Sequence, residues 1–215
     1  YRHPSQTALF VGDFIDRGPQ IAKTLRLVRE MVESGAAKAV MGNHEFNAIA
    51  YHTIAPSRDR GFLRVHIEKN NRQHAETLKQ LTGAEVAEAV PWFRSLPMYL
   101  DLGDCRLVHA CWSGRDLGII DDALAECDGL TDEFMEEATD CHSPLFHAVE
   151  HVLKGPEMNL PAGQAYDDKD GHRRIKARTQ WFRKPPLGNI AKYTFPESVA
   201  PLGSLSASFD PAVEP

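Results

Sequence analysis

Residues 8–18 and 39–45 read ALFVGDFIDRG and AVMGNHE, and these two stretches decide the fold. Each opens with a short apolar run that is typical of a buried strand and continues into a glycine followed by polar residues. Between them, apolar side chains recur at helical spacing over residues 21–32. A strand, a crossover helix and a strand form a βαβ unit with two parallel strands. Because ligands gather at the carboxyl ends of such strands, the sequence predicts that GDFIDRG and GNHE share one functional rim.

Composition excludes several classes of function. The 215 residues carry 30 acidic and 24 basic side chains, which gives a net charge of −6. A general nucleic-acid-binding surface needs a basic face, so we expect no such partner. No apolar run approaches the roughly 18 residues that a membrane helix needs, and we expect no membrane partner. The four cysteines form no CxxC pair, which favours a reduced, cytoplasmic setting.

The whole chain is predicted to form one domain, with an α/β fold. We divide it into a core (1–112), a helical insertion (113–160), a hairpin (161–184) and a Pro-rich connector (185–215). Within the core, residues 98–102 and 105–109 are expected to pair as strands around the turn at Gly103 and Asp104. The stretch 58–81 is polar and helical, with a weak apolar line through Ile67, His74, Leu78 and Leu81.

Three polar side chains at predicted strand ends have the character of metal ligands. Asp13, Asn43 and His109 offer a carboxylate, an amide oxygen and an imidazole, a set that suits Mn²⁺, Fe or Zn²⁺. A carboxylate can bridge two such ions about 3.5–4 Å apart, which activates water at neutral pH. The alternatives are ordinary structural roles, with Asn43 as a helix N-cap and His109 as a satisfied strand-end histidine. GDxxDRG and GNHE together specify nine residues, and a chance match of order 10⁻¹¹ per placement favours the functional interpretation.

The neighbouring residues suit the hydrolysis of a phosphate ester without a covalent enzyme intermediate. Arg17 offers a planar fork for two phosphate oxygens. His44 is a candidate proton donor to the leaving oxygen, with Asp16 fixing its tautomer. In the basic hairpin, Arg178 is expected to add a second phosphate contact, whereas the alternative is a solvated charged hairpin.

Three stretches resemble motifs of the calcineurin-like metallophosphoesterases, namely Gly12–Pro19, Met41–Glu45 and Val108–Ala110. They are similar to the second, third and fourth motifs of that superfamily. The nearest branch is the bacterial group related to serine/threonine phosphoprotein phosphatases and symmetrical diadenosine tetraphosphatases. The resemblance implies a two-sheet β-sandwich flanked by helices in four layers, with the helical insertion added to it. It also implies two divalent metal ions, with manganese as the first choice and iron or zinc as the others.

The resemblance further implies a role for each motif residue. For the metals, Asp13 bridges both ions, and Asn43 and His109 bind the second ion. For the substrate, Asn43 is a further contact, Arg17 holds the phosphate, and His44 and Asp16 form the acid dyad. The family's first motif, GDxHG, and its last Gly-His motif have no counterpart here. We therefore expect a fragment of a longer enzyme that is inactive alone. The substrate is a phosphoprotein, or else a dinucleoside polyphosphate or another small phosphate ester. A degenerate, non-catalytic phosphate- or metal-binding module is the alternative from another class.

Overall fold

The computed structural model describes residues 2–56, 61–160, 163–167, 173–182 and 194–195. Its helices are α1 (Ile21–Glu33), α2 (Asn43–His52), α3 (Glu68–Gln80), α4 (Gly83–Ser95), α5 (Gly114–Glu126), α6 (Asp132–Thr139) and α7 (Pro144–Lys154). Its strands are β1 (Ala8–Phe10), β2 (Ala37–Ala39), β3 (Tyr99–Asp101), β4 (Arg106–Val108), β5 (Glu157–Asn159), β6 (Tyr166–Asp167), β7 (Arg173–Arg174), β8 (Lys176–Thr179) and β9 (Thr194–Phe195). Most of the predicted connector and the turn of the predicted hairpin lie outside the described residues.

The predicted βαβ unit is present. β1 and β2 pair in parallel, with Ala8 opposite Ala37. The second strand ends two residues earlier than the sequence indicates, at Ala39 instead of Met41. The last bond to β1 is the one that the backbone N–H of Val40 donates to the carbonyl of Phe10 at 3.0 Å, while the N–H of Met41 donates to the carbonyl of Pro97 at 2.8 Å. The chain therefore leaves the β1 ladder just before the GNHE segment.

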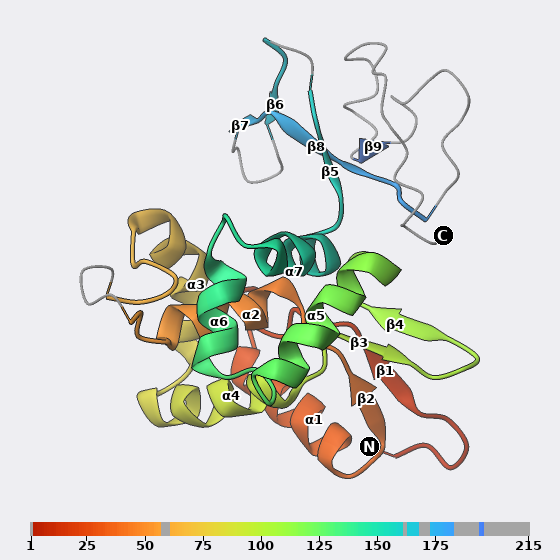
Figure 1. The fold of residues 1–215 in the computed structure, drawn as a ribbon. Coiled ribbons are helices and arrows are strands. Elements are labelled where there is room, and N and C mark those ends of the chain that lie inside the picture. The colour runs from red at the N-terminus through yellow and green to blue at the C-terminus, as the bar shows by residue number, and fades with distance from the viewer. Residues whose placement is uncertain (1, 57–60, 161–162, 168–172, 183–193, 196–215) are drawn as a thin grey trace.

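Helix packing around this unit forms the main hydrophobic core. As predicted, α1 buries the apolar side chains of its helical repeat, Ile21, Leu25, Val28 and Met31. The other helices add large, fully buried side chains: Ile49 from α2, Phe93 from α4, Ile120 from α5, Phe134 and Met135 from α6, and Leu145 and Leu153 from α7. In Figure 1, β2 lies beside α1, and β5–β9 lie beyond α7.

The predicted helical insertion folds as α5, α6 and α7. The hydroxyls of Thr131 and Ser143 accept backbone N–H groups at the starts of α6 and α7, as their positions predict. Pro144 occupies the first turn of α7, and Gly155 ends that helix at φ +82°. The same capping chemistry also starts α5, where the Ser113 hydroxyl accepts from the N–H of Asp116.

Two helices differ from the prediction. The polar helix begins at Glu68 instead of residue 58. Its predicted apolar line is confirmed at His74 and Leu81, which are buried, and wrong at Ile67 and Leu78, which are exposed. Thr77, which the line omits, is buried as well. Helix α4 has no counterpart in the sequence prediction, although a capping box between Thr82 and Glu85 marks its start.

The α/β class is confirmed. Within the described residues, the strands form two- and three-stranded sheets: β1-β2, β3-β4, β5-β8-β9 and β6-β7. The two-sheet sandwich and the division into parts stay predictions. None of the four cysteines forms a disulfide. None of the helices in the described part of the chain has the length and apolar character that crossing a lipid bilayer requires.

Candidate active site

Two glycines bring the motif loops together at the carboxyl ends of β1 and β2. A Cβ atom on Gly12 would lie 2.2 Å from the backbone nitrogen of Gly42, and one on Gly42 would lie 2.5 Å from Asp13 Oδ1. Neither position has room for a side chain. Asp13 and Asp16 adopt positive φ angles of 60° and 67°, a strained geometry that is enriched at functional sites. The predicted common rim is therefore present in the structure.

A buried carboxylate holds the two loops in register. Glu45 is fully buried and accepts the backbone N–H groups of Gly42 at 2.9 Å, Asp13 at 2.8 Å and Phe14 at 2.7 Å. Burial raises the pKa of Glu45 and these N–H donors lower it, with a net rise. Because one of the three donors belongs to its own loop and two to the β1–α1 loop, Glu45 fixes where Asp13 stands relative to α2.

The three predicted metal ligands converge. Nε2 of His109 lies 3.3 Å from Oδ1 of Asn43 and 3.5 Å from Oδ1 of Asp13. Nδ1 of His109 is hydrogen-bonded to the carbonyl of Val11. Since a carbonyl only accepts, Nδ1 carries the proton and Nε2 presents a lone pair. Asn43 is the first residue of α2, whose N-cap is Gly42, so the interpretation of Asn43 as an N-cap is wrong.

This convergence fits a divalent cation. With His109 in its neutral Nδ1–H form, a carboxylate oxygen, an amide oxygen and an imidazole nitrogen all present lone pairs to one region. Such a set repels itself unless a positive charge lies among its members. Hard and borderline cations such as Mn²⁺, Fe²⁺ and Zn²⁺ accept this mixture of oxygen and nitrogen ligands.

The predicted acid dyad is formed. Nδ1 of His44 lies 2.7 Å from Oδ2 of Asp16. Nε2 of His44 faces the cluster of ligands, 3.9 Å from Oδ2 of Asp13. Burial lowers the pKa of His44, but the hydrogen bond to Asp16 and the charges of Asp13 and Asp16 raise it more, so the net shift is upward. The pairing with Asp16 therefore favours the protonated form of the His44 ring, next to the predicted metal ligands.

The two predicted phosphate-binding arginines occupy different places. Arg17 is exposed beside the dyad, and its charge lowers the pKa of His44. Arg178 is exposed on β8, opposite Glu157 of β5. No described contact joins Arg178 to the motif residues. The end of its strand reaches the site, because Trp181 Nε1–H donates to the carbonyl of Ala110, next to His109, at 2.6 Å.

Three residues of the site have no role in the sequence prediction. Glu45 is the last residue of GNHE, and the signal for it is its place three residues after Gly42, at the N3 position of a capping box. His74 and Thr77 reach Asp16 from α3, 58 and 61 residues along the chain. Their spacing of three places both on one helix face, but nothing local in the sequence indicates what that face contacts.

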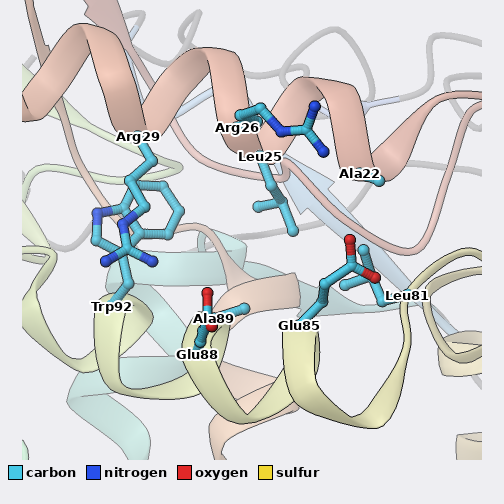
Figure 2. Close-up of a pocket in the computed structure, with 9 residues that line it drawn as sticks. All are labelled: Ala22, Leu25, Arg26, Arg29, Leu81, Glu85, Glu88, Ala89 and Trp92. Atoms are coloured by element: carbon cyan, nitrogen blue, oxygen red, sulfur yellow. The ribbon is translucent and has the colours of Figure 1, made fainter.

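A separate groove runs between α1 and α4 (Figure 2). Leu25, Arg26 and Arg29 of α1 face Glu85, Ala89 and Trp92 of α4 across it. None of the converging motif residues lines this groove. Its opposite charges and its apolar floor are typical of helix packing at a surface.

Comparison with known proteins identifies the family. The model of the calcineurin-like phosphoesterases matches residues 2–167, which is more than half of the chain. The chain belongs to the calcineurin-like phosphoesterases. The suspected superfamily is therefore confirmed. No solved structure matches the chain significantly.

Curated relatives indicate the branch of the family to which the chain is similar. The phosphoesterase is 34% identical over 103 residues to a symmetrical bis(5'-nucleosyl)-tetraphosphatase of Methylococcus capsulatus, covering 47% of this chain and 31% of the relative. It is 31% identical over 102 residues to the protein of the same name from Ralstonia nicotianae, covering 47% and 31%. With the Vibrio cholerae protein of that name, identity is 26% over 167 residues, covering 76% and 47%. The matches thus span less than half the length of these relatives.

Proposed function

We propose that this phosphoesterase hydrolyses a small phosphate ester using divalent metal ions, held in part by Asp13, Asn43 and His109. The observation that carries the proposal is the convergence of three lone-pair atoms from these side chains within 3.5 Å of His109 Nε2. Divalent ions, when bound, activate water and offset charge on the phosphoryl oxygens. In this proposal there are two ions, with manganese preferred, and Asp13 bridges them.

The chain's own residues carry the proton and position the phosphate. His44 holds a proton on Nδ1 toward Asp16 and presents Nε2 to the ligands. Its raised pKa supports a role as the acid that protonates the leaving oxygen. Arg17, exposed on the same loop, is positioned to hold two phosphate oxygens with its fork. Asn43 is proposed to contact the substrate as well as the metal.

The substrate class rests on the relatives. Their shared name, symmetrical bis(5'-nucleosyl)-tetraphosphatase, supports a dinucleoside polyphosphate or another small ester over a phosphoprotein. The test is to load the full-length protein with Mn²⁺, Fe²⁺ or Zn²⁺ and measure hydrolysis of p-nitrophenyl phosphate, a dinucleoside tetraphosphate and a phosphopeptide. Activity with none of these ions on any of the three substrates contradicts the proposal and supports a non-catalytic module.

Paired variants separate the two proposed roles. His44→Asn is expected to lower turnover and leave bound metal nearly unchanged, since His44 moves a proton. Asp13→Asn is expected to lose metal and activity together. The exposed Glu30→Gln on α1 is the control for handling and folding. If His44→Asn loses its metal, the assigned roles are wrong.

A further inference from the structure

Helix α3 turns a polar face toward the candidate active site. Its two buried residues are His74 and Thr77, which are 4% and 2% exposed. Nδ1 of His74 lies 2.6 Å from Oδ1 of Asp16, and Oγ1 of Thr77 lies 2.6 Å from the same oxygen. The backbone N–H of Asp16 in turn donates to Oγ1 of Thr77 at 2.8 Å. A helix that buries polar side chains must satisfy them, and here Asp16 satisfies both.

These contacts occupy both oxygens of the Asp16 carboxylate. Oδ2 accepts from Nδ1–H of His44 at 2.7 Å, while Oδ1 accepts from His74 and Thr77. Because a carboxylate only accepts hydrogen bonds, each imidazole must carry its proton on Nδ1. With donors on both oxygens, the carboxylate cannot rotate without breaking a bond. Its plane, and therefore the direction in which His44 points, is set from the α3 side.

A third histidine contacts the second. Nδ1 of His74 faces Asp16, so its Nε2 is the atom that meets the third ring. Nε2 of His52 lies 3.1 Å from Nε2 of His74. Burial, together with the charges of His74 and His66, lowers the pKa of His52 to about 4, which keeps this ring neutral. Tyr51 covers His74, with ring centroids 4.9 Å apart.

The direction of the donors decides between two roles for this chain of rings. Hydrogen bonds run from His44 to Asp16 and from His74 to Asp16. Both of them end at one carboxylate, whose pKa its hydrogen-bond donors lower more than burial raises it. Passing a proton through such an acceptor is unfavourable, because the carboxylate would have to be protonated. The arrangement therefore suits positioning and not proton conduction.

We propose that His74 is a positioning residue for phosphoester hydrolysis. Together with Thr77 it holds Asp16 so that His44 keeps Nδ1–H on Asp16 and directs Nε2–H at the leaving oxygen. Transfer of the Nε2 proton then leaves His44 as its neutral Nδ1–H tautomer. This inference rests on the proposed function, in which His44 is the acid. An apolar residue at position 74 would fill the same space and leave Asp16 Oδ1 with one donor fewer. His44 would then sample orientations and tautomers that cannot protonate the substrate.

The test compares leaving groups. Aryl phosphates with poor leaving groups, such as phenyl phosphate, depend on the acid, whereas p-nitrophenyl phosphate depends on it little. We expect His74→Leu to lower kcat on phenyl phosphate about 10–100-fold, the range for an outer partner of a functional group. The loss on p-nitrophenyl phosphate is expected to be much smaller, with KM and metal content unchanged. His74→Asn, whose amide N–H can reach Asp16 Oδ1, is expected to restore most of the lost rate.

A second pair of variants, at position 77, controls for a folding defect caused by the substitution at position 74. Thr77→Val removes the hydroxyl at nearly constant shape, and Thr77→Ser retains it. The valine variant should show the same leaving-group dependence, and the serine variant should not. An equal loss on both substrates in the His74→Leu and Thr77→Val variants overturns the inference, because a merely structural defect lowers both rates alike.

Two further readouts separate this inference from the function on which it rests. His44→Asn must itself show the greater loss on phenyl phosphate; if it does not, the proposed acid role fails. If it does and His74→Leu does not, the positioning role alone is wrong. Nitrogen-15 NMR of His44, at a pH where the ring is neutral, reports the tautomer without turnover. We expect the Nδ1–H form in the unmodified protein and a mixture in His74→Leu, and an unchanged tautomer overturns the inference.

Discussion

Oε2 of Glu45 lies 2.8 Å from the backbone nitrogen of Asp13, across 32 residues of sequence. The bond is part of a set of three, since the same carboxylate also accepts from Gly42 and Phe14. A residue that touches neither substrate nor proton thus determines where the proposed bridging ligand stands. The glutamate of the GNHE motif therefore has a structural role, which is to accept backbone hydrogen bonds.

Glu45→Gln is expected to destabilise the protein and misplace Asp13. An amide offers one acceptor oxygen, so its NH₂ group must face at least one of the three backbone donors. A buried donor left without an acceptor costs about 1–3 kcal/mol. Urea unfolding measures the loss, and metal titration should show weaker binding. The exposed Glu30→Gln on α1 should change stability by no more than about 0.5 kcal/mol. Equal stability of the two variants would contradict this role of Glu45.

Gly42→Ala is expected to disrupt the site more than its small size suggests. The added Cβ would lie 2.5 Å from both the backbone nitrogen and Oδ1 of Asp13, so the β1–α1 loop must move. Metal affinity and activity should fall together. Gly118→Ala is the matched control, because nothing lies within 4 Å of its Cβ. In the middle of α5 that change should stabilise by roughly 0.5–1 kcal/mol. Retained metal affinity in Gly42→Ala would show that the loop accommodates a methyl group.

Sequence reasoning predicted the parts of this fold that local patterns encode. The βαβ unit and the buried stripe of α1 both follow from spacing and residue type. The convergence of Asp13 and Asn43 followed from one topological rule, that parallel strands end at one edge. His109 lies with them because its imidazole is hydrogen-bonded to Val11 at the end of β1.

The parts that were missed depend on contacts far apart in sequence. His74 looked like a member of an apolar line, since a histidine facing inward from a helix gives no sign of its partner. Only the tertiary structure brings Asp16 against that face. The two exposed leucine and isoleucine positions of α3 were misassigned for the same reason, because the helix is held by polar contacts and not by an apolar stripe.

Asp16 is expected to make stability fall in acid. Burial raises its pKa, but the hydrogen bonds from His44, His74 and Thr77 lower it more, to well below the usual range. In the unfolded chain the value is about 3.9. The folded state therefore binds fewer protons, so this contribution is fully present above about pH 5 and is lost as pH falls toward the folded pKa.

Comparison with Asp16→Asn isolates this effect, since other carboxylates titrate alike in both proteins. The variant should be less stable near neutral pH, because its NH₂ group must face a donor. The difference in unfolding free energy between the variant and the unmodified protein should shrink below about pH 4, because the unmodified protein then loses the Asp16 contribution. Urea midpoints of the metal-free proteins between about pH 3 and pH 7 measure the difference. A deficit that stays constant with pH would contradict the lowered pKa.

Arg178→Ala is expected to raise KM for small phosphate esters about 3–10-fold, equivalent to roughly 1 kcal/mol of binding. Arg178 lies three residues before Trp181, which is tied to the residue after His109 by a 2.6 Å hydrogen bond. That hydrogen bond brings the end of β8 to the rim, and a guanidinium on this strand can reach toward bound phosphate.

Lys176 is the matched control. It is a cation two residues away, so it lies on the same exposed face of β8, opposite the buried Ala177. A specific contact predicts a change for Arg178→Ala and little for Lys176→Ala, whereas equal small effects indicate only the general charge of the hairpin. An unchanged KM and kcat in Arg178→Ala would leave the solvated hairpin as the correct interpretation.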